Sequence, residues 1–340
     1  MTQPLFNNQG SFDPDSLRVV LADCEFPRLS TELIAAAVGL IGDDPAMLDL
    51  KIAGAALTEM REAYRAFAPY RGLRKATVFG SARVKADDPL YRQAREVARC
   101  LADTGWMIIT GAGPGIMAAA MEGAGRERSF GVNIRLPFEQ GSNEIIAGDA
   151  KLVSMKYFFT RKLMLMKESS AFVCLPGGFG TLDETFELIT LTQTGKGAPV
   201  PIVFLDTPGD PYWEQVHAFV EGQLVARGLV APEDLALYHI TDSPQAAVDE
   251  ITRFFTNFHS QRYVGDLLFL RVQRVPSADQ LTALNHRFGD LCARGEITVG
   301  APHREEVNDD DHLGLGRLRL RFDKRQYGRL RQLVDAINEW

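Results

Sequence analysis

Between residues 74 and 260, short apolar segments alternate with longer amphipathic ones. The short segments are rich in β-branched and aromatic side chains, which is typical of buried strands. We expect strands at residues 75–80, 106–110, 129–136, 171–176, 199–206 and 237–242. Helical periodicity fills the intervals, at residues 90–105, from Pro114 onward, and at 156–170, 181–196, 212–228 and after Ser243. This alternation predicts an α/β fold, a doubly wound parallel Rossmann-like sheet with helices on both faces.

The two ends of the chain follow other patterns. Residues 1–16 are polar, as in a loose tail, and residues 17–70 have the three- and four-residue spacing of helices. After residue 262 we expect a strand (263–275), a helix (277–295), two strands (296–302 and 316–323) and a last helix (326–340). The expected domains are an N-terminal tail and helical extension (1–73), the Rossmann-like domain (74–260) and a small C-terminal α+β module (261–340).

Composition narrows the class of protein. The chain has 46% hydrophobic and 24% charged residues, enough for a folded core, and its net charge of -7 argues against a nucleic-acid or acidic-membrane binder. No apolar run reaches the ~20 residues of a membrane helix, and the first residues lack the pattern of a secretory signal. The cysteines and histidines show no metal-ligand spacing, so no metal or other cofactor is expected. These features predict a soluble cytoplasmic protein.

One strand of the C-terminal module carries a stripe of arginines. Strand periodicity places Arg317, Arg319 and Arg321 on one face and Leu318, Leu320 and Phe322 on the other. We expect this face to meet water or the acidic segment EEVNDDD, since charge runs usually form solvated faces. The alternative is a binding site for an anionic effector.

Two glycine-rich turns carry the candidate chemistry. TGAGPGIM (110–117) and LPGGFGTLDE (175–184) each follow a predicted strand and open a predicted helix. In a parallel sheet, ligands bind beyond the carboxyl ends of the strands, where helix N-termini offer free N–H groups to anions. Two such turns in one sheet favour a phosphorylated ligand. The first turn is not G-x-G-x-x-G and no P-loop motif is present, which disfavours a dinucleotide or a P-loop nucleotidase.

The second turn also holds a carboxylate with two interpretations. Thr181 and Glu184 fit a helix capping box, in which Glu184 would only bond the backbone N–H of Thr181. The basic helix one strand upstream, with Arg161 and Lys162, favours a functional interpretation. Its chain leads into the strand that ends at Pro176, so Arg161 and Glu184 can meet over the glycine turn.

Four separated motifs resemble the LONELY GUY (LOG) family of nucleoside 5'-monophosphate phosphoribohydrolases, whose members were often labelled lysine decarboxylases. PGGFGTLDE fits its PGGxGTxxE motif, Arg161-Lys162 fits the arginine-lysine pair before it, and TGAGPGIM and VFGSAR match in order and spacing. The resemblance covers roughly residues 74–257. Ala112 stands where the family usually has glycine, and MKYFFTRK resembles the longer bacterial branch rather than the plant-type members.

The resemblance implies hydrolysis of the N-glycosidic bond of a nucleoside 5'-monophosphate, such as AMP or a cytokinin riboside monophosphate, to free base and ribose 5-phosphate. Glu184 would stabilise the positive charge that develops at C1' or activate a water, and Arg161 would hold the phosphate or the ribose hydroxyls. The implied substrate and phosphate contacts are Ser81, Gly113, Glu139, Lys162, Gly177, Gly178, Gly180, Thr181 and Thr190. For Glu139 an exposed loop carboxylate is an equal alternative.

Other functions remain open at this point. The same fold could carry a phosphorylated cofactor without cleaving it, as in the molybdenum cofactor carriers that resemble this family. Lysine decarboxylation is disfavoured, because Lys162 and Lys167 lie on an amphipathic helix with nothing to single them out for a Schiff base. The resemblance also implies a homodimer. The apolar part of that helix, LMLMK, is expected to be core rather than a dimer face, and Cys174 is expected to be core as well.

Overall fold

The computed structural model describes residues 17, 19–21, 24–135 and 141–340. The chain forms two compact units, Met1–Thr58 and Glu59–Trp340. Each unit is described separately.

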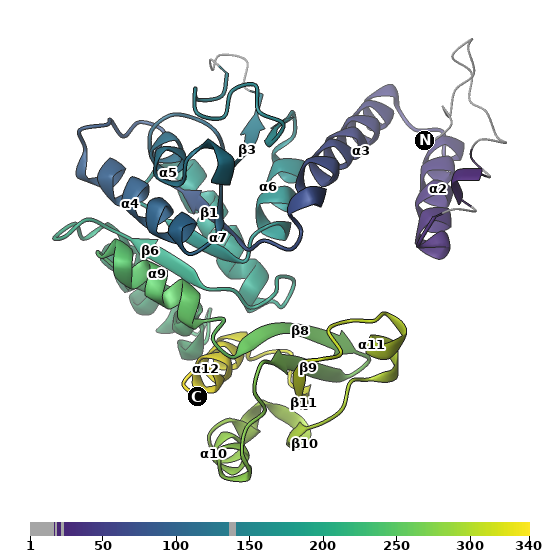
Figure 1. The fold of residues 1–340 in the computed structure, drawn as a ribbon, viewed down its shortest axis with the longest axis vertical. Coiled ribbons are helices and arrows are strands. Elements are labelled where there is room, and N and C mark those ends of the chain that lie inside the picture. Colours follow the sequence, from purple (N-terminus) through teal and green to yellow (C-terminus); the bar gives the residue numbers. More distant parts are fainter. Residues whose placement is uncertain (1–16, 18, 22–23, 136–140) are drawn as a thin grey trace. The chain divides into compact units, whose positions relative to one another are not determined.

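The described residues of the first unit include the expected helices, and the tail predicted at residues 1–16 lies outside the described residues. The unit holds α2 (Pro27–Gly42) and the beginning of α3 (Met47–Phe67), which continues into the second unit (Figure 1). Pro27 fits the first turn of α2 because the N–H that proline lacks would have no partner there. No helix in the described part of the chain is long and apolar enough to cross a membrane.

The second unit is built on a seven-stranded parallel sheet with the order β4-β3-β2-β1-β5-β6-β7. All six predicted strands are present: β1 (Lys75–Phe79), β2 (Met107–Thr110), β3 (Ser129–Ile134), β5 (Ala171–Cys174), β6 (Ile202–Leu205) and β7 (His239–Thr241). The predicted fold class is therefore confirmed. A seventh strand, β4 (Leu152–Met155), lies in a segment that was expected to be loop, and it pairs with β3 at the edge of the sheet.

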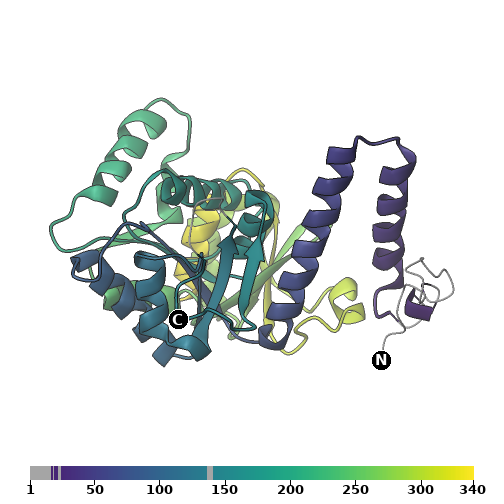
Figure 2. The same ribbon diagram turned by 90° about the horizontal axis from the view of Figure 1, so that it is seen from above.

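Helices cover both faces of this sheet (Figure 2). One face packs against α4 (Pro89–Asp103), α5 (Ile116–Ala124) and α9 (Pro244–Arg253). The other packs against the end of α3 and against α6 (Phe158–Lys167), α7 (Phe179–Gln193) and α8 (Tyr212–Phe219), which continues as the π-helix η3 (Val220–Val225). The shorter helical turns are η1 (Ala68–Tyr70), η2 (Arg126–Arg128) and η4 (Pro232–Leu237). Met164 and Leu165 of α6 and Cys174 of β5 are fully buried, so the core assignments are confirmed for these residues.

The C-terminal module has a four-stranded antiparallel sheet with the order β10-β11-β9-β8. The single strand predicted at 263–275 is wrong, because Gly265, with a φ of 60°, turns the chain between β8 (Phe258–Val264) and β9 (Leu267–Val272). The module continues through α10 (Ala278–Phe288), η5 (Gly289–Leu291), β10 (Cys292–Val299), α11 (Arg304–Asn308), β11 (Gly316–Phe322) and α12 (Tyr327–Ile337). Helices α10 and α12 share a core with one face of the sheet.

The last helix joins the module to the parallel-sheet domain. The Asn338 side chain donates from Nδ2 to the Phe254 carbonyl (2.6 Å) and accepts from the Asn257 and Phe258 N–H groups through Oδ1. Arg331 of α12 forms a buried ion pair with Glu250 of α9. The two sheets of the second unit are thus tied through buried polar contacts.

The opposite face of the small sheet carries the predicted arginine stripe. Arg317 is fully buried, and its Nη2 lies 3.4 Å from Oε1 of Glu306 in the acidic segment. Arg271 of β9 lies 2.8 Å from the same oxygen. The prediction that the stripe meets the acidic segment is confirmed for Arg317, which is however not solvated.

Replacing Glu306 with glutamine should lower the free energy of unfolding by roughly 3–5 kcal/mol, because two buried arginines would lose their shared carboxylate. Urea denaturation measures this change. Glu305→Gln is the matched control, since Glu305 is exposed on the same helix. Equal stability of the two variants would contradict this account of the stripe.

Candidate active site

The two glycine turns meet at the carboxyl ends of β1, β2 and β5. Ser81, just after β1, donates its N–H to the Pro176 carbonyl of the second turn (3.2 Å). Its own carbonyl accepts from the Ile116 N–H at the start of α5 (3.0 Å). Gly115 has a φ of 66°, and a Cβ there would lie 2.4 Å from the Ser81 oxygen. Ser81 therefore joins the two turns, as their positions in the predicted sheet require.

The first turn holds a backbone conformation that L-residues rarely adopt. Ala112, at the position where glycine is usual in LOG proteins, has a φ of 59°. Asn143 braces this turn by donating its backbone N–H to the Ala112 carbonyl (2.8 Å) and its Nδ2 to the Gly113 carbonyl (3.1 Å). The sequence analysis missed Asn143, because nothing in its neighbourhood distinguishes it from other loop asparagines.

Arg161 and Glu184 meet, as expected, beside these turns. The Arg161 Nη1 on α6 lies 3.4 Å from Oε1 of Glu184 on α7, and both side chains are largely buried. The Arg161 Nε donates to the Val132 carbonyl of β3 (3.0 Å). A Cβ at Gly111 would lie 2.3 Å from the Arg161 Nη2, so only glycine leaves room for the guanidinium at the end of β2. Gly111 was not among the predicted site residues.

The capping-box interpretation of Glu184 is wrong. Helix α7 begins at Phe179 with Gly178 as its N-cap, so Thr181 already lies inside the helix. The preceding glycine pair, Gly177 and Gly178, allows the helix to begin earlier than the predicted N-cap at Thr181. Glu184 is only 6% exposed. Burial raises the pKa of its carboxyl group, against the opposing effect of Arg161 and Lys162.

The second turn is shaped for close backbone approach. A Cβ at Gly177 would lie 2.1 Å from the Thr181 Oγ1 and 3.0 Å from the Ser81 N, whereas a Cβ at Gly178 would meet nothing within 4 Å. The Tyr212 hydroxyl of α8 donates to the Gly177 carbonyl (2.8 Å) and fixes the turn. The first N–H groups of α7, around Gly180, have no partner inside the helix and are suited to an anion.

Two predicted contacts, Lys162 and Thr190, are not brought to this point. Lys162 forms ion pairs with Asp183 (2.8 Å) and Glu187 (2.7 Å), and so ties α6 to α7. Thr190 lies further along α7, is exposed, and donates to the Phe186 carbonyl of its own helix (2.7 Å). Glu139 lies outside the described residues.

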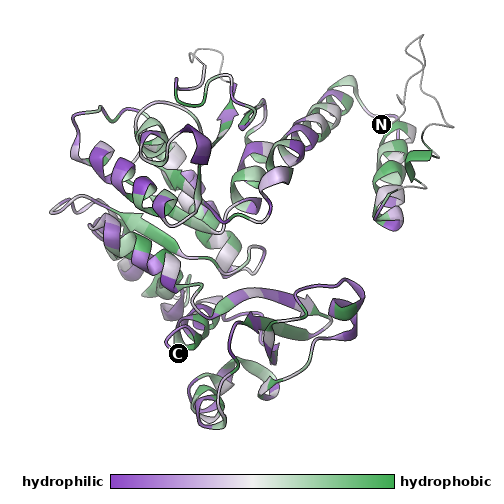
Figure 3. Cartoon of the chain, in the orientation of Figure 1, coloured by the Kyte–Doolittle hydropathy of each residue, from purple (hydrophilic) through white to green (hydrophobic). Residues whose placement is uncertain are grey.

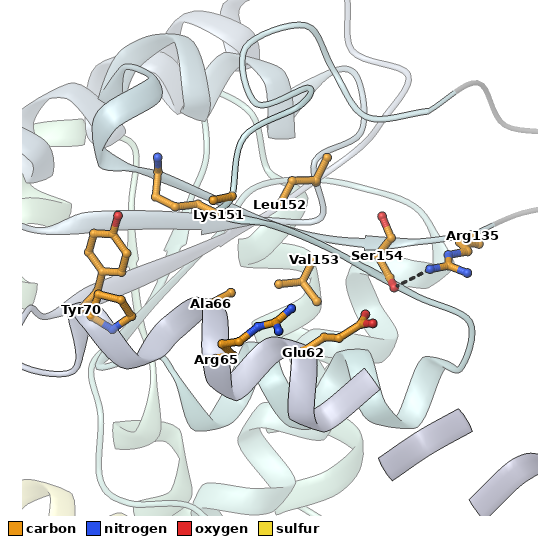
Figure 4. A pocket seen from close by; sticks show the side chains of 11 residues that line it. Glu62, Arg65, Ala66, Tyr70, Arg135, Lys151, Leu152, Val153 and Ser154 are labelled. Carbon is orange, nitrogen blue, oxygen red and sulfur yellow. Dashed lines mark hydrogen bonds between the residues drawn. The ribbon is translucent and has the colours of Figure 1, made fainter. Parts of the chain in front are cut away.

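No group of three or more histidine, cysteine or acidic side chains in the described ranges could hold a metal ion. A cavity of about 520 Å³ lies along edge strand β4, between it and the end of α3 (Figure 4). Its lining includes Arg65, Arg135 and Lys151 but none of the predicted site residues. The candidate site therefore rests on the glycine turns and the Arg161–Glu184 pair.

Part of the chain is similar to known proteins. Residues 115–251 match the family model described as possible lysine decarboxylase. A cytokinin riboside 5'-monophosphate phosphoribohydrolase of Mycobacterium tuberculosis is 29% identical over 160 residues, which is 47% of this chain and 83% of the relative. A probable enzyme of the same name from Oryza sativa subsp. japonica is 29% identical over 172 residues, 48% of this chain and 77% of the relative.

Solved structures of low identity also align. The molybdenum cofactor binding protein of Rippkaea orientalis has 18% identity and a TM-score of 0.37, with 53% of this chain and 96% of that chain covered. The molybdenum cofactor carrier protein of Chlamydomonas reinhardtii has 19% identity and a TM-score of 0.36, with 53% and 97% covered.

Gly111→Ala should displace the Arg161 guanidinium from Glu184 while the fold is retained. We expect the free energy of unfolding to fall by about 1–3 kcal/mol, the usual result of overpacking. Urea denaturation gives the loss, and a crystal structure of the variant gives the Nη1–Oε1 distance. Gly178→Ala is the control, because a Cβ there meets nothing within 4 Å. An unchanged stability with the guanidinium still in place would contradict the role of Gly111.

Proposed function

This chain belongs to the lysine decarboxylase/LOG family, and we propose that it hydrolyses the N-glycosidic bond of a nucleoside 5'-monophosphate to free base and ribose 5-phosphate. The observation that carries the proposal is the buried Arg161–Glu184 pair beside two glycine turns. A carrier needs only amide groups to hold a phosphate, whereas bond cleavage needs a charged group near the anomeric carbon.

Departure of the base leaves positive charge on C1' and the ring oxygen of the sugar. In the proposed reaction the Glu184 carboxylate stabilises this charge and orients the attacking water. The helix N-terminus around Gly178, Gly180 and Thr181 receives the 5'-phosphate, and Ser81 and Gly113 line the same strand ends. Arg161 remains protonated, fixes Glu184 and contacts the phosphate or the ribose hydroxyls.

The contacts of Lys162 and Lys167 argue against the older decarboxylase label. A pyridoxal phosphate enzyme needs a lysine amine that can deprotonate and form a Schiff base. Lys162 is held between two carboxylates, and Lys167 lies 2.5 Å from Glu168. Against the opposing effect of burial, the hydrogen bonds to Asp183 and Glu187 raise the pKa of the Lys162 amine, and the Lys167 amine is engaged by a carboxylate, so neither residue fits that cofactor.

We propose that a second copy of the chain covers an apolar patch beside the site. Phe158, Phe159 and Leu163 of α6 are about half exposed (53%, 54% and 45%), and Phe179 at the second turn is 93% exposed. Large exposed aromatic side chains next to a site are typical of interfaces. The resemblance to LOG proteins implies the same homodimer.

We also propose that the C-terminal module binds an anionic effector at a hollow of about 420 Å³ on β10 and β11. Arg294, Arg319 and Arg321 line it. Glu296 also lines the hollow, and Asp266 pairs with both Arg294 and Arg321 (2.9 Å each), so the three arginines leave an excess of positive charge there. The Thr298 hydroxyl accepts from the Arg319 Nε (2.9 Å) and orients that guanidinium.

Glu184→Gln should lower kcat for base release from AMP by at least 100-fold, because the amide cannot stabilise the developing positive charge. AMP binding, measured by calorimetry, should change less than threefold. Liberated adenine is assayed by chromatography, with Glu127→Gln, at an exposed glutamate of η2, as the control. Binding of AMP without any base release by the wild-type protein would favour the carrier function.

The pH profile of the same assay reports on the role of Glu184. Burial raises the pKa of its carboxyl group, and the carboxylate is the active form, so kcat/KM should fall below a pH that is higher than the ordinary value for a glutamate. Arg161→Gln removes a charge that lowers this pKa and should move the acid limb to still higher pH. An acid limb at the same pH in both proteins would contradict the assignment.

Arg319→Ala should weaken binding of inorganic pyrophosphate at least tenfold in calorimetry, because the oriented guanidinium is lost. Arg325→Ala is the control, since the Arg325 side chain is 89% exposed outside the hollow. Equal affinities of the two variants, or no binding by the wild-type protein, would overturn the effector site.

A further inference from the structure

A glutamate lies on the buried face of the end of α3. Figure 3 shows hydrophilic and hydrophobic residues interleaved along this helix, as expected where one side meets the core. Residues 59, 63 and 67 follow the spacing of one helix face, and Ala63 and Phe67 are buried. Glu59 shares this face and is only 8% exposed. A buried carboxylate is costly unless it receives hydrogen bonds, so its partners indicate its role.

Both oxygens of this carboxylate contact the beginning of α6. Glu59 Oε1 accepts the backbone N–H of Lys156 (2.8 Å), and Oε2 accepts the hydroxyl of Thr160 (2.6 Å). Thr160 is fully buried, and the end of α3 shares a core with Met164 and Leu165 of α6 (Figure 1). Glu59 thus ties α3 to residues that lie 97 and 101 positions later in the chain.

The two contacts lie on either side of the start of α6. Among the described residues, Tyr157 is the N-cap of this helix, and its side chain makes no capping hydrogen bond. Helices usually begin with Ser, Thr, Asp or Asn at this position, whose side-chain oxygen fixes the first turn. Glu59 binds the residue before the N-cap and the third residue of the helix, and it places negative charge at the positive end of the helix dipole. A neighbouring helix therefore holds the first turn of α6.

Arg161 leaves the helix from this turn. It follows Thr160 directly, and its backbone N–H donates to the Tyr157 carbonyl (3.2 Å). The Arg161 Nη1 lies 3.4 Å from Oε1 of Glu184, which is close to the longest separation of a hydrogen bond. A small displacement of the turn would separate the two groups, so the position of the guanidinium depends on how firmly the turn is held.

We propose that Glu59 is a positioning residue, which acts through the first turn of α6 to hold Arg161 against Glu184. Glu59 lies outside residues 115–251, which match the family model, so the helical extension before the parallel sheet supports the site. The effect of Glu59 on catalysis rests on the proposed hydrolase function, whereas its effect on the geometry of the pair does not.

A crystal structure of the full-length Glu59→Ala variant tests the geometry. We expect the Arg161 Nη1 to lie beyond hydrogen-bond distance of Glu184, because the first turn of α6 loses both contacts. Glu59→Gln should keep the wild-type arrangement, since its amide can accept from the Lys156 N–H and donate to the Thr160 oxygen. The Thr160 hydroxyl can then donate to the Tyr157 carbonyl, which lies 2.8 Å away.

Glu62→Ala is the matched control for these structures. Glu62 is an exposed glutamate of the same helix, at the cavity shown in Figure 4, and its loss should leave the Arg161–Glu184 contact unchanged. Glu59→Asp keeps the charge and shortens the side chain, and it provides a second measurement if the alanine variant does not fold. A guanidinium that stays in place in both Glu59→Ala and Glu59→Asp would overturn the proposal, whether or not the protein is an enzyme.

The pH profile of base release from AMP separates positioning from a general loss of stability. In Glu59→Ala, kcat/KM should fall at least tenfold, and its acid limb should move to higher pH, as in Arg161→Gln. Burial raises the pKa of Glu184, and Arg161 is the largest of the effects that lower it, followed by Lys162, while Asp183 raises it. Withdrawal of the guanidinium therefore shifts the limb upward, and Glu59→Gln should restore kcat/KM to within threefold of the wild-type value.

A double-variant cycle completes the test. Glu59→Ala added to Arg161→Gln should move the acid limb no further, because both changes act through the same guanidinium. Additive shifts, or a lower kcat/KM with the acid limb in its wild-type place, would show that Glu59 supports only the fold and would overturn its positioning role. A wild-type protein that releases no base would contradict the proposed hydrolase function, and the crystal structures would then decide the role of Glu59.

Discussion

Arg161 and Glu184 come from two different helices and meet above the ends of three strands. Both side chains are largely buried. The free-energy cost of removing two charges from water often exceeds the attraction between them. A buried ion pair is therefore a poor device for stability. In the proposed hydrolysis, its position beside two glycine turns would serve the chemistry, since a low-dielectric site strengthens the field of a carboxylate at the moment when positive charge develops nearby.

The pair can form only because the surrounding backbone comes close. Gly111 leaves the space that the guanidinium occupies, Gly177 leaves the space for the Thr181 hydroxyl, and Gly115 passes over the Ser81 carbonyl. These glycines are needed for different reasons, since Gly111 and Gly177 leave room for side chains and Gly115 allows two backbone segments to come close. A sequence motif written as a series of glycines hides this difference, and a single alanine has a different effect at each position.

The fold was largely predictable because parallel strands covered on both faces are nearly continuous apolar runs. Strand β4 was not predicted from the sequence because it is short and only every second residue is buried, as in edge strands. The β8–β9 hairpin was hidden because an apolar segment continues on both sides of its glycine turn. In the site, Arg161 and Glu184 were found from motifs, whereas Asn143 acts through backbone carbonyls of a distant turn, and no local pattern signals such a contact.

The neighbouring cations of α6 show why a two-residue motif does not imply two equal roles. Successive residues on a helix point about 100° apart, so Arg161 and Lys162 cannot both face the sheet. Arg161 reaches the Val132 carbonyl and Glu184, and Lys162 reaches Asp183 and Glu187 on the flank of α7. The lysine thereby fixes the spacing of α6 and α7, and that spacing sets the distance between arginine and glutamate. One residue of the motif provides the charge at the site, and its neighbour holds the two helices at the separation that the charge requires.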